Sequence, residues 1–232
     1  MSGIFITGTD TGVGKTLITG LLARAMAELG KSVITQKWVQ TGVRNFADTD
    51  IATHLSLMKQ NISRIEPFMS DIIPYCFKFP ASPHLAAKRE KQRINPRKIE
   101  RAYLALCKIS EVVLAEGAGG LMVPLTSKIL FIDLAHKLQL PIVLVVHNKL
   151  GAINHALLSI ETVRRRNLKL IGLIFNNAEN QNVEILNDNV RTVASLSREN
   201  ILGIVPYSQN QNRLYRAIKP MAENILNRID HE

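Results

Sequence analysis

Residues 8–16 read Gly-Thr-Asp-Thr-Gly-Val-Gly-Lys-Thr, and this stretch decides the fold that the sequence predicts. An apolar run at residues 4–6 precedes it and a stretch of helical period at residues 17–29 follows, so we expect a strand, a tight loop and a helix. Glycines let the backbone curl until successive N–H groups point at one anion, and the helix adds the positive end of its dipole. The stretch therefore predicts a phosphate-binding loop, in which Lys15 reaches the β- and γ-phosphates and the Thr16 hydroxyl holds Mg²⁺.

The loop is one residue longer than the ordinary Walker pattern, which has four residues between its first glycine and the Gly-Lys pair. Here five residues separate Gly8 from Gly14, and Thr9 occupies the ordinary first-glycine position. The alternative is a glycine turn with a chance Gly-Lys-Thr. The order of strand, loop and helix favours phosphate binding over that alternative.

Length and composition predict one large α/β domain spanning residues 1–232, because 46% hydrophobic content is ample for a core. The sequence lacks a run of about 20 apolar residues that could span a bilayer, and its start lacks the basic flank of a signal peptide. We therefore expect a cytoplasmic protein. Cys76 and Cys107 are too few and too isolated for a disulfide framework or a thiolate metal site, so we expect two buried or half-buried thiols.

The formal net charge of +10 is compatible with nucleic acid, a membrane surface or an anionic nucleotide as partner. The basic residues are scattered, without interleaved aromatic residues and without a known nucleic-acid motif. Arg164, Arg165 and Arg166 fall at the expected end of a helix, where cations stabilise the helix dipole. We therefore expect neither a nucleic acid nor a membrane as partner.

Short apolar runs alternate with stretches of helical period along the whole chain, which predicts a doubly wound α/β fold of the P-loop NTPase type. Right-handed crossovers should join mainly parallel strands, with helices flanking the sheet and ligands at the carboxyl ends of the strands. The expected strands lie at 4–7, 32–36, 112–116, 142–147, 170–176 and 201–206. The expected helices lie at 16–29, 50–59, 96–109, 131–138, 152–166, 183–198 and 213–228.

The second expected strand should lie next to the phosphate-binding loop and deliver Lys37 as a second cation near the γ-phosphate. A surface lysine is the usual alternative, but a lysine that leaves a buried strand requires an anionic partner. Thr41 and Gly42 continue as a turn that can present a hydroxyl to a second substrate.

Acidic residues near two strand ends supply the hard oxygen ligands that Mg²⁺ prefers. Asp48 is better placed to cap the following helix, which leaves Asp50 to face the site, although either could be the metal ligand. Glu116 emerges just before a glycine-rich turn, and its alternative role is that of a turn-capping acid. With Thr16, these carboxylates predict a magnesium site.

The later strand ends predict places for the base and for a substrate carboxylate. Asn176 and Asn177 offer carboxamides to an adenine edge, although a turn pair is the simpler reading. The helix start after Gly151 could hold a carboxylate on its free N–H groups. His147 and His155 lack the third ligand and the spacing of a zinc site, so we expect no metal there.

Taken together, these motifs resemble the dethiobiotin synthetase family, in order over almost the whole chain, and members of that family carry the longer loop. The resemblance implies one doubly wound P-loop domain, a homodimer with sites at the subunit interface, and a ligase of biotin biosynthesis. The implied reaction uses ATP, Mg²⁺ and CO₂ to close a ureido ring on 7,8-diaminopelargonic acid, through a carbamate and a carbamic-phosphoric anhydride. The motifs that carry the resemblance lie at residues 8–16, 37–42, 82–84, 116–120 with Pro124 and Leu125, and 149–155.

The resemblance also implies roles for individual residues. Lys15, Lys37 and Thr11 would act in catalysis, and Thr16, Asp50 and Glu116 would bind Mg²⁺. Two positions depart from the family pattern, because Trp38 stands where proline is common and Asn177 where aspartate is frequent. The implied nucleotide-binding residues are Gly12, Val13, Gly14, Lys15, Thr16, Leu17, Asp50, Glu116, Gly117, Ala118, Gly119, Asn176, Asn177, Val205, Pro206, Tyr207 and Ser208. The implied diamine-binding residues are Thr41 and, from the partner subunit, Leu150, Gly151, Ala152, Ile153 and Asn154.

Two other classes of protein share this kind of loop. Corrin-amidating synthetases append a glutaminase domain, for which 232 residues leave no room. ATPase switches of the ParA and MinD type place an additional lysine early in the loop, where this chain has Thr9 and Asp10, and this chain also lacks the aspartate expected at the end of their partner-sensing strand. The sequence therefore favours the synthetase over both alternatives.

Overall fold

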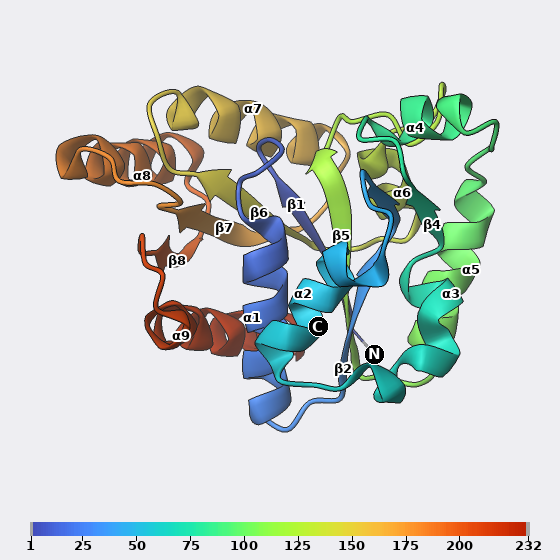
Figure 1. The fold of residues 1–232 in the computed structure, drawn as a ribbon. Helices are drawn as coiled ribbons and strands as arrows, with labels where there is room; N and C mark the ends of the chain where they lie inside the picture. Colours follow the sequence, from blue (N-terminus) through green and yellow to red (C-terminus); the bar gives the residue numbers. More distant parts are fainter. Residues whose placement is uncertain (1, 231–232) are drawn as a thin grey trace.

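The computed structural model describes residues 2–230 and contains a six-stranded sheet in which all neighbouring strands are parallel. The strand order is β2-β5-β1-β6-β7-β8, so the chain winds outward in both directions from β1 (Figure 1). The predicted doubly wound, parallel sheet is confirmed. The strands are β1 (Ser2–Gly8), β2 (Val33–Lys37), β5 (Val112–Gly120), β6 (Ile142–His147), β7 (Leu170–Asn176) and β8 (Ile201–Val205).

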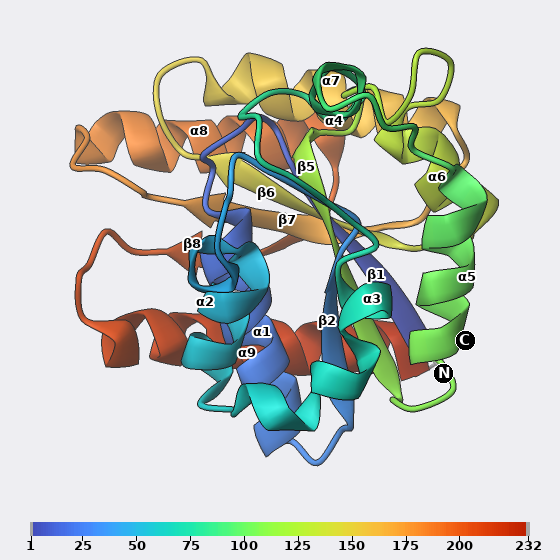
Figure 2. The same cartoon turned by 45° about the vertical axis from the view of Figure 1, so that its right-hand side comes forward.

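Helices cover both faces of this sheet, as the continuous apolar character of its strands requires (Figures 1 and 2). One apolar cluster joins side chains of the first and last helices to residues of β1, β5, β6 and β7, and two further clusters lie under helices of the opposite face. On the first face lie α1 (Lys15–Glu28) and α9 (Gln211–Asp230), with α2 (Asp50–Met58) packed against α1. On the second face lie α5 (Pro96–Leu106), α6 (Phe131–Lys137), α7 (Ala152–Arg165) and α8 (Val183–Ser197).

The segment between β2 and α5 contains elements that the sequence pattern did not predict. A separate pair of short parallel strands, β3 (Val39–Thr41) and β4 (Tyr75–Phe77), continues the chain beyond β2. These strands have three residues each, too few for a periodic pattern to show. The remaining elements of this segment are η1 (Phe46–Asp48), η2 (Ile62–Arg64), η3 (Glu66–Phe68), α3 (Met69–Ile72) and α4 (Pro83–Arg89).

The register of the central strands aligns the residues at their carboxyl ends. Glu116 on β5 pairs with Ile6 on β1 and with Lys37 on β2. The end of β2 lies beside the phosphate-binding loop, as expected, because Lys37 lines the same cavity as Gly12 and Lys15, although β5 separates β2 from β1 in the sheet. Glu116 is therefore placed between the loop on one side and Lys37 on the other.

Trp38, one of the two departures from the family pattern, is part of the core. Its side chain is fully buried and stacks on Phe5, with ring centroids 4.4 Å apart, and on Phe131, with centroids 6.1 Å apart. The indole N–H donates to Gln36 Oε1 at 3.0 Å. Because its ring is buried and its polar atom is satisfied, tryptophan fits this position.

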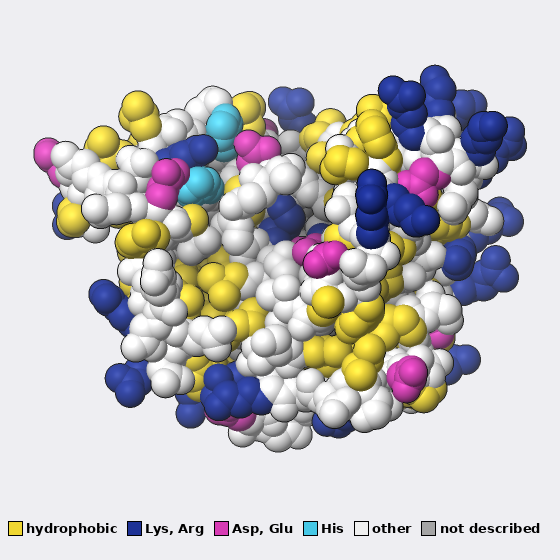
Figure 3. Space-filling model, in the orientation of Figure 1, with side chains coloured by type: hydrophobic (Ala, Val, Ile, Leu, Met, Phe, Trp, Pro, Cys, Tyr) yellow, Lys and Arg dark blue, Asp and Glu magenta, His cyan; other side chains and the backbone are white. Residues whose placement is uncertain are grey.

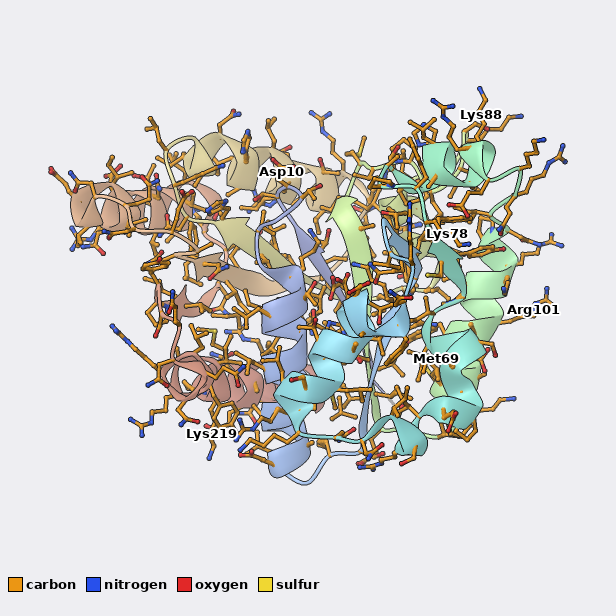
Figure 4. The ribbon with its side chains drawn as sticks, in the orientation of Figure 1. Asp10, Met69, Lys78, Lys88, Arg101 and Lys219 are labelled. Atoms are coloured by element: carbon orange, nitrogen blue, oxygen red, sulfur yellow. The ribbon has the colours of Figure 1, made fainter. Side chains whose placement is uncertain are left out.

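The surface carries its positive charge unevenly. Lys and Arg side chains gather over α4 and α5, where Figure 4 labels Lys88 and Arg101, at the upper right of Figure 3. At the predicted helix end, Arg164 pairs with Glu199 and Arg166 with Asp133. Within residues 2–230 the helices are too short or too polar to cross a membrane.

The cysteine prediction is half right. Neither thiol is in a disulfide, and Cys107 is half-buried, but Cys76 is exposed on β4. Side chains alternate between the two faces of a strand, and the short pair formed by β3 and β4 leaves the face of Cys76 open to solvent.

Candidate functional site

The loop between β1 and α1 has the backbone that its glycines predict. Gly12 and Gly14 have φ angles of 73° and 97°, in the left-handed region that glycine adopts without steric cost. Gly14 takes the N-cap position of α1, so the loop runs directly into the helix N-terminus. Figure 4 labels Asp10 in this loop, near α7. A β-carbon on Gly14 would lie 2.2 Å from Nδ2 of Asn176, so glycine is required here by space as well as by conformation.

Lys15 is buried at the start of α1, and its ammonium points back into the loop. Its Nζ donates to the carbonyl oxygen of Asp10 at 2.8 Å. Burial, with a smaller contribution from the nearby cation Lys37, lowers the pKa of Lys15 to about 8. A phosphate bound in the loop would place a further anion next to this ammonium and raise its pKa.

Lys37 lies between two carboxylates. Its Nζ is 2.7 Å from Glu116 Oε1 and 2.5 Å from Asp50 Oδ2, and it donates to the carbonyl oxygen of Gly117 at 2.9 Å. These contacts use all three ammonium protons. Burial alone would lower the pKa of Lys37, but the two carboxylates raise it above its ordinary value. Lys37 therefore stays charged inside the protein.

Glu116 is fully buried and every contact around it favours the carboxylate. Its Oε1 accepts hydrogen bonds from Lys37 and, at 3.2 Å, from Thr16 Oγ1, while Oε2 lies 2.9 Å from Nε2 of His54. Burial alone would raise the pKa of Glu116, but the charge of Lys37 and the hydrogen bond to His54 hold it well below its usual range.

The structure distinguishes between the two candidate aspartates. Asp48 is exposed in η1, whereas Asp50 begins α2 and pairs with Lys37. The expectation that Asp48 caps the helix is wrong, because the cap is Thr49, whose Oγ1 accepts from the Ala52 N–H at 3.2 Å. The backbone N–H of Asp50 donates to Gln40 Oε1 at 3.0 Å, which ties the start of α2 to β3.

These residues surround one cavity of about 330 Å³. It brings together a helix N-terminus, two lysines, two carboxylates and a hydroxyl, which suits a polyphosphate with a hard divalent cation. Within residues 2–230, no three His, Cys, Asp or Glu side chains form a metal-binding group. A cation here would therefore use the Thr16 hydroxyl and phosphate oxygens besides the two carboxylates. The lining is Thr11, Gly12, Gly14, Lys15, Thr16, Lys37, Val39, Gln40, Thr41, Asp50, Glu116, Ala118 and Gly119.

A second cavity of about 440 Å³ adjoins the first, and the two share Thr11, Thr41, Ala118 and Gly119. Its other wall is the chain that leads into α4, residues 80–83, which includes Ser82 and Pro83 of the motif at residues 82–84. Thr41 and Thr11 therefore lie at the boundary between the two cavities. A second substrate in this cavity would contact a phosphate in the first cavity at these two residues.

The predicted adenine residues lie on the other side of the loop. Asn176 is buried and its Nδ2 donates to the carbonyl oxygen of Val13 at 2.9 Å. Asn177 accepts a hydrogen bond from Asn148 Nδ2 on its side chain, and its backbone N–H donates to the carbonyl oxygen of Val205 at 2.9 Å. Residues 205–208 are thereby brought beside Asn177.

The predicted carboxylate-binding residues are not brought to this site within one chain. A separate cavity against α8 is lined by Leu150, Gly151, Ile153 and Asn154, and Leu150 is 79% exposed. Gly151 precedes α7 with a φ of 89°, so the helix start has the expected turn. The cavity that these residues line does not include Thr41.

Comparison with known proteins decides the family. A family model described as an AAA domain matches residues 2–213. The chain is 43% identical over 173 residues to an ATP-dependent dethiobiotin synthetase of Haemophilus influenzae, which covers 75% of this chain and 90% of the relative. It is also 34% identical over 227 residues to the enzyme of that name from Bacillus cereus, covering 97% and 92% of the two chains. This chain belongs to the ATP-dependent dethiobiotin synthetase family.

Solved structures with similar folds come from the ATPases considered as an alternative. A chain of the MinC:MinD cell division protein complex of Aquifex aeolicus matches with a TM-score of 0.61 at 17% identity, over 98% of this chain and 96% of that chain. A ParA family ATPase from Chlorobium tepidum matches with a TM-score of 0.56 at 14% identity, over 99% of both chains. At these identities the likeness shows the P-loop fold alone, whereas the dethiobiotin synthetase relatives show the family.

The sequence reasoning missed His54, which contacts Glu116 from α2. Asp50 and His54 are four residues apart, so they share one face of the helix, and that spacing was the available signal. It also missed Asn148 and Asn189, which are buried and hydrogen-bonded to each other at 2.9 Å next to Asn177.

Proposed function

We propose that this chain is a dethiobiotin synthetase that closes a ureido ring on 7,8-diaminopelargonic acid with CO₂ and ATP, releasing ADP and phosphate. The observation that carries the proposal is one cavity that contains two lysines, two carboxylates and the Thr16 hydroxyl. A second cavity adjoins it, and Thr41 lines both. Membership of the ATP-dependent dethiobiotin synthetase family supports this substrate assignment.

Catalysis of the proposed reaction depends on positioning the substrates and on neutralising the charge of the transferred phosphoryl group. One substrate amine takes up CO₂ as a carbamate, and a carbamate oxygen attacks the γ-phosphate while the bond to ADP breaks. The second amine then attacks the carbamoyl carbon, and phosphate leaves as the ring closes. Lys15 and Lys37 would neutralise the phosphoryl oxygens, and Thr11 and Thr41 would orient the carbamate and the diamine from the shared wall.

The residues present fit Mg²⁺, because a hydroxyl and two carboxylates are hard oxygen donors in one phosphate-sized cavity. Thr16, Asp50 and Glu116 would hold the ion, which would supply charge neutralisation to the phosphates. Lys37 contacts both carboxylates, so contact with a phosphate oxygen would require exchange of one of its present acceptors.

The nucleotide would lie over the loop, with its phosphates on the N–H groups of residues 12–17 and its adenine toward Asn176, Asn177 and residues 205–208. Asn176 already donates to the loop carbonyl of Val13, so its Oδ1 is the atom left for the adenine amino group. Asn177 would contribute through its backbone hydrogen bond to Val205, which holds residues 205–208 beside it.

The proposal includes a single domain over residues 1–232, a cytoplasmic location and a homodimer whose sites lie at the subunit interface. Within one chain, Leu150, Gly151, Ile153 and Asn154 line a cavity that does not include Thr41. In the proposed dimer, the start of α7 from the partner would receive the diamine's carboxylate on its free N–H groups.

The decisive experiment measures ADP release from ATP and Mg²⁺ with diaminopelargonate and bicarbonate, against the same mixture without the diamine. We expect ADP release to depend on the diamine and to match the amount of dethiobiotin formed. ADP release at equal rates with and without the diamine would refute the synthetase assignment and favour an ATPase switch.

The lowered pKa of Lys15 predicts a pH-dependent affinity for ATP. Below pH 8, Lys15 is already protonated in the free protein, so ATP binding is accompanied by little proton uptake. Above pH 8 the free Lys15 is neutral and bound phosphate raises its pKa, so binding should take up about one proton and affinity should fall about tenfold per pH unit. Calorimetry at pH 7 and pH 9, in two buffers of different ionisation enthalpy, measures both effects.

Lys15→Arg is the matched control for this pH dependence, because arginine stays charged over the whole range. The variant should bind ATP with nearly the same affinity at pH 7 and pH 9. Equal ATP affinity of the unmodified protein at both pH values, with no proton uptake at pH 9, would contradict the prediction.

A further inference from the structure

His54 is a buried polar side chain in direct contact with the predicted magnesium site. It is fully buried on α2, its Nε2 lies 2.9 Å from Glu116 Oε2, and within residues 2–230 its Nδ1 has no hydrogen-bond partner. An apolar residue would fill this position without leaving a ring nitrogen unsatisfied. The contact with Glu116 is therefore the feature that a histidine adds here.

Because of the contact with His54, the two oxygens of the Glu116 carboxylate have different partners. Oε1 is the atom shared by Lys37 and Thr16 and faces the cavity, whereas Oε2 is held by the imidazole. A carboxylate accepts, so the proton lies on Nε2 and His54 donates. Rotation of the carboxylate would break this bond, and both of its oxygens are thereby fixed in place.

The packing of α2 on α1 places His54 at this point. Gly20 lies four residues after Thr16, so both share one face of α1. A β-carbon on Gly20 would lie 3.1 Å from the Cα of His54, which shows how closely α2 approaches α1 there. The Thr16 and Gly20 face of one helix thus meets the Asp50 and His54 face of the other.

We propose that His54 is a positioning residue that orients Glu116, so that Oε1 alone is presented to the divalent cation of the nucleotide complex. This inference rests on the proposed function, in which Glu116 binds Mg²⁺. Residues that orient metal ligands through a second hydrogen bond contribute about tenfold to a hundredfold to metal affinity.

The test measures Mn²⁺ binding to the full chain with saturating ADP, by electron paramagnetic resonance of free Mn²⁺, in three variants. His54→Leu keeps apolar volume and removes the donor, and should weaken Mn²⁺ about tenfold to a hundredfold. His54→Gln places a carboxamide nitrogen near the position of Nε2 and should restore most of the affinity. His54→Asn is too short to reach Glu116 and should behave like the leucine variant.

Two controls separate orientation from general damage. ADP affinity in EDTA should stay within about twofold in all three variants, because the phosphate-binding loop is unchanged. His136→Leu, at an exposed position on α6, should leave Mn²⁺ binding unchanged. If the leucine variant fails to fold, the pair of glutamine and asparagine variants still decides the question.

The inference is overturned if folded His54→Leu binds Mn²⁺ as tightly as the unmodified protein, or if glutamine and asparagine weaken binding equally. The measurement needs no diamine, so it is separable from the synthetase assay. An unmodified protein that binds Mn²⁺ with ADP but shows no diamine-dependent turnover would remove the proposed function and leave this inference standing. An unmodified protein that binds no Mn²⁺ with ADP would overturn both.

Discussion

Replacing Lys37 with alanine is expected to lower turnover of ATP and diamine by about a hundredfold to a thousandfold, the effect of removing one preorganised group that stabilises transition-state charge. ATP affinity should change by only a few-fold, because Lys15 and the N–H groups of the loop remain. Steady-state ADP release and calorimetric titration with ATP measure the two effects separately.

The substitution also removes the cation that lies between Glu116 and Asp50. Breaking a buried ion pair from one side costs about 3–5 kcal/mol of stability, so thermal unfolding must accompany the kinetics, and both must be measured well below the melting temperature. Lys219→Ala, at an exposed position on α9 (Figure 4), is the matched control and should leave turnover and stability unchanged.

Chemical rescue distinguishes lost charge from lost structure in this variant. A small alkylammonium ion can enter the space left by the lysine side chain and restore a cation beside Glu116, so turnover should rise with its concentration. Unchanged turnover in folded Lys37→Ala would refute a catalytic role for this residue. A loss of ATP binding as large as the loss of turnover would assign Lys37 to nucleotide binding.

Much of the fold could be predicted because buried parallel strands leave continuous apolar runs in the sequence. The β6 and β7 boundaries match the prediction, and the helices begin or end within a few residues of the expected positions. Lys37 and Glu116 could be placed at one edge of the sheet because both come at the ends of strands.

The parts of the fold and of the site that could not be predicted depend on contacts between segments far apart in sequence. The position of β5 between β1 and β2 is a choice of strand order, which periodicity does not encode. His54 meets Glu116 only because α2 crosses α1 at Gly20, a tertiary contact over 62 residues of sequence. Thr49 caps α2 in place of Asp48 because η1 takes up the three preceding residues.

Replacing Gly14 with alanine is expected to abolish measurable ATP binding and to destabilise the protein. Alanine at a φ of 97° is strained, and its β-carbon would lie 2.2 Å from Nδ2 of Asn176, which is anchored to the carbonyl oxygen of Val13. Strain and displacement together should cost about 2–4 kcal/mol. Calorimetry with ATP and denaturant unfolding provide the two measurements.

Gly30→Ala is the matched control, because Gly30 has a φ of 89° and open space around its would-be β-carbon among the described residues. This variant should show only the conformational cost of about 1–2 kcal/mol and bind ATP normally. Because the additional cost at Gly14 comes from the Asn176 side chain, Gly14→Ala should be less destabilising in an Asn176→Ala background than alone. Equal destabilisation in both backgrounds would show that backbone strain alone excludes alanine from this loop.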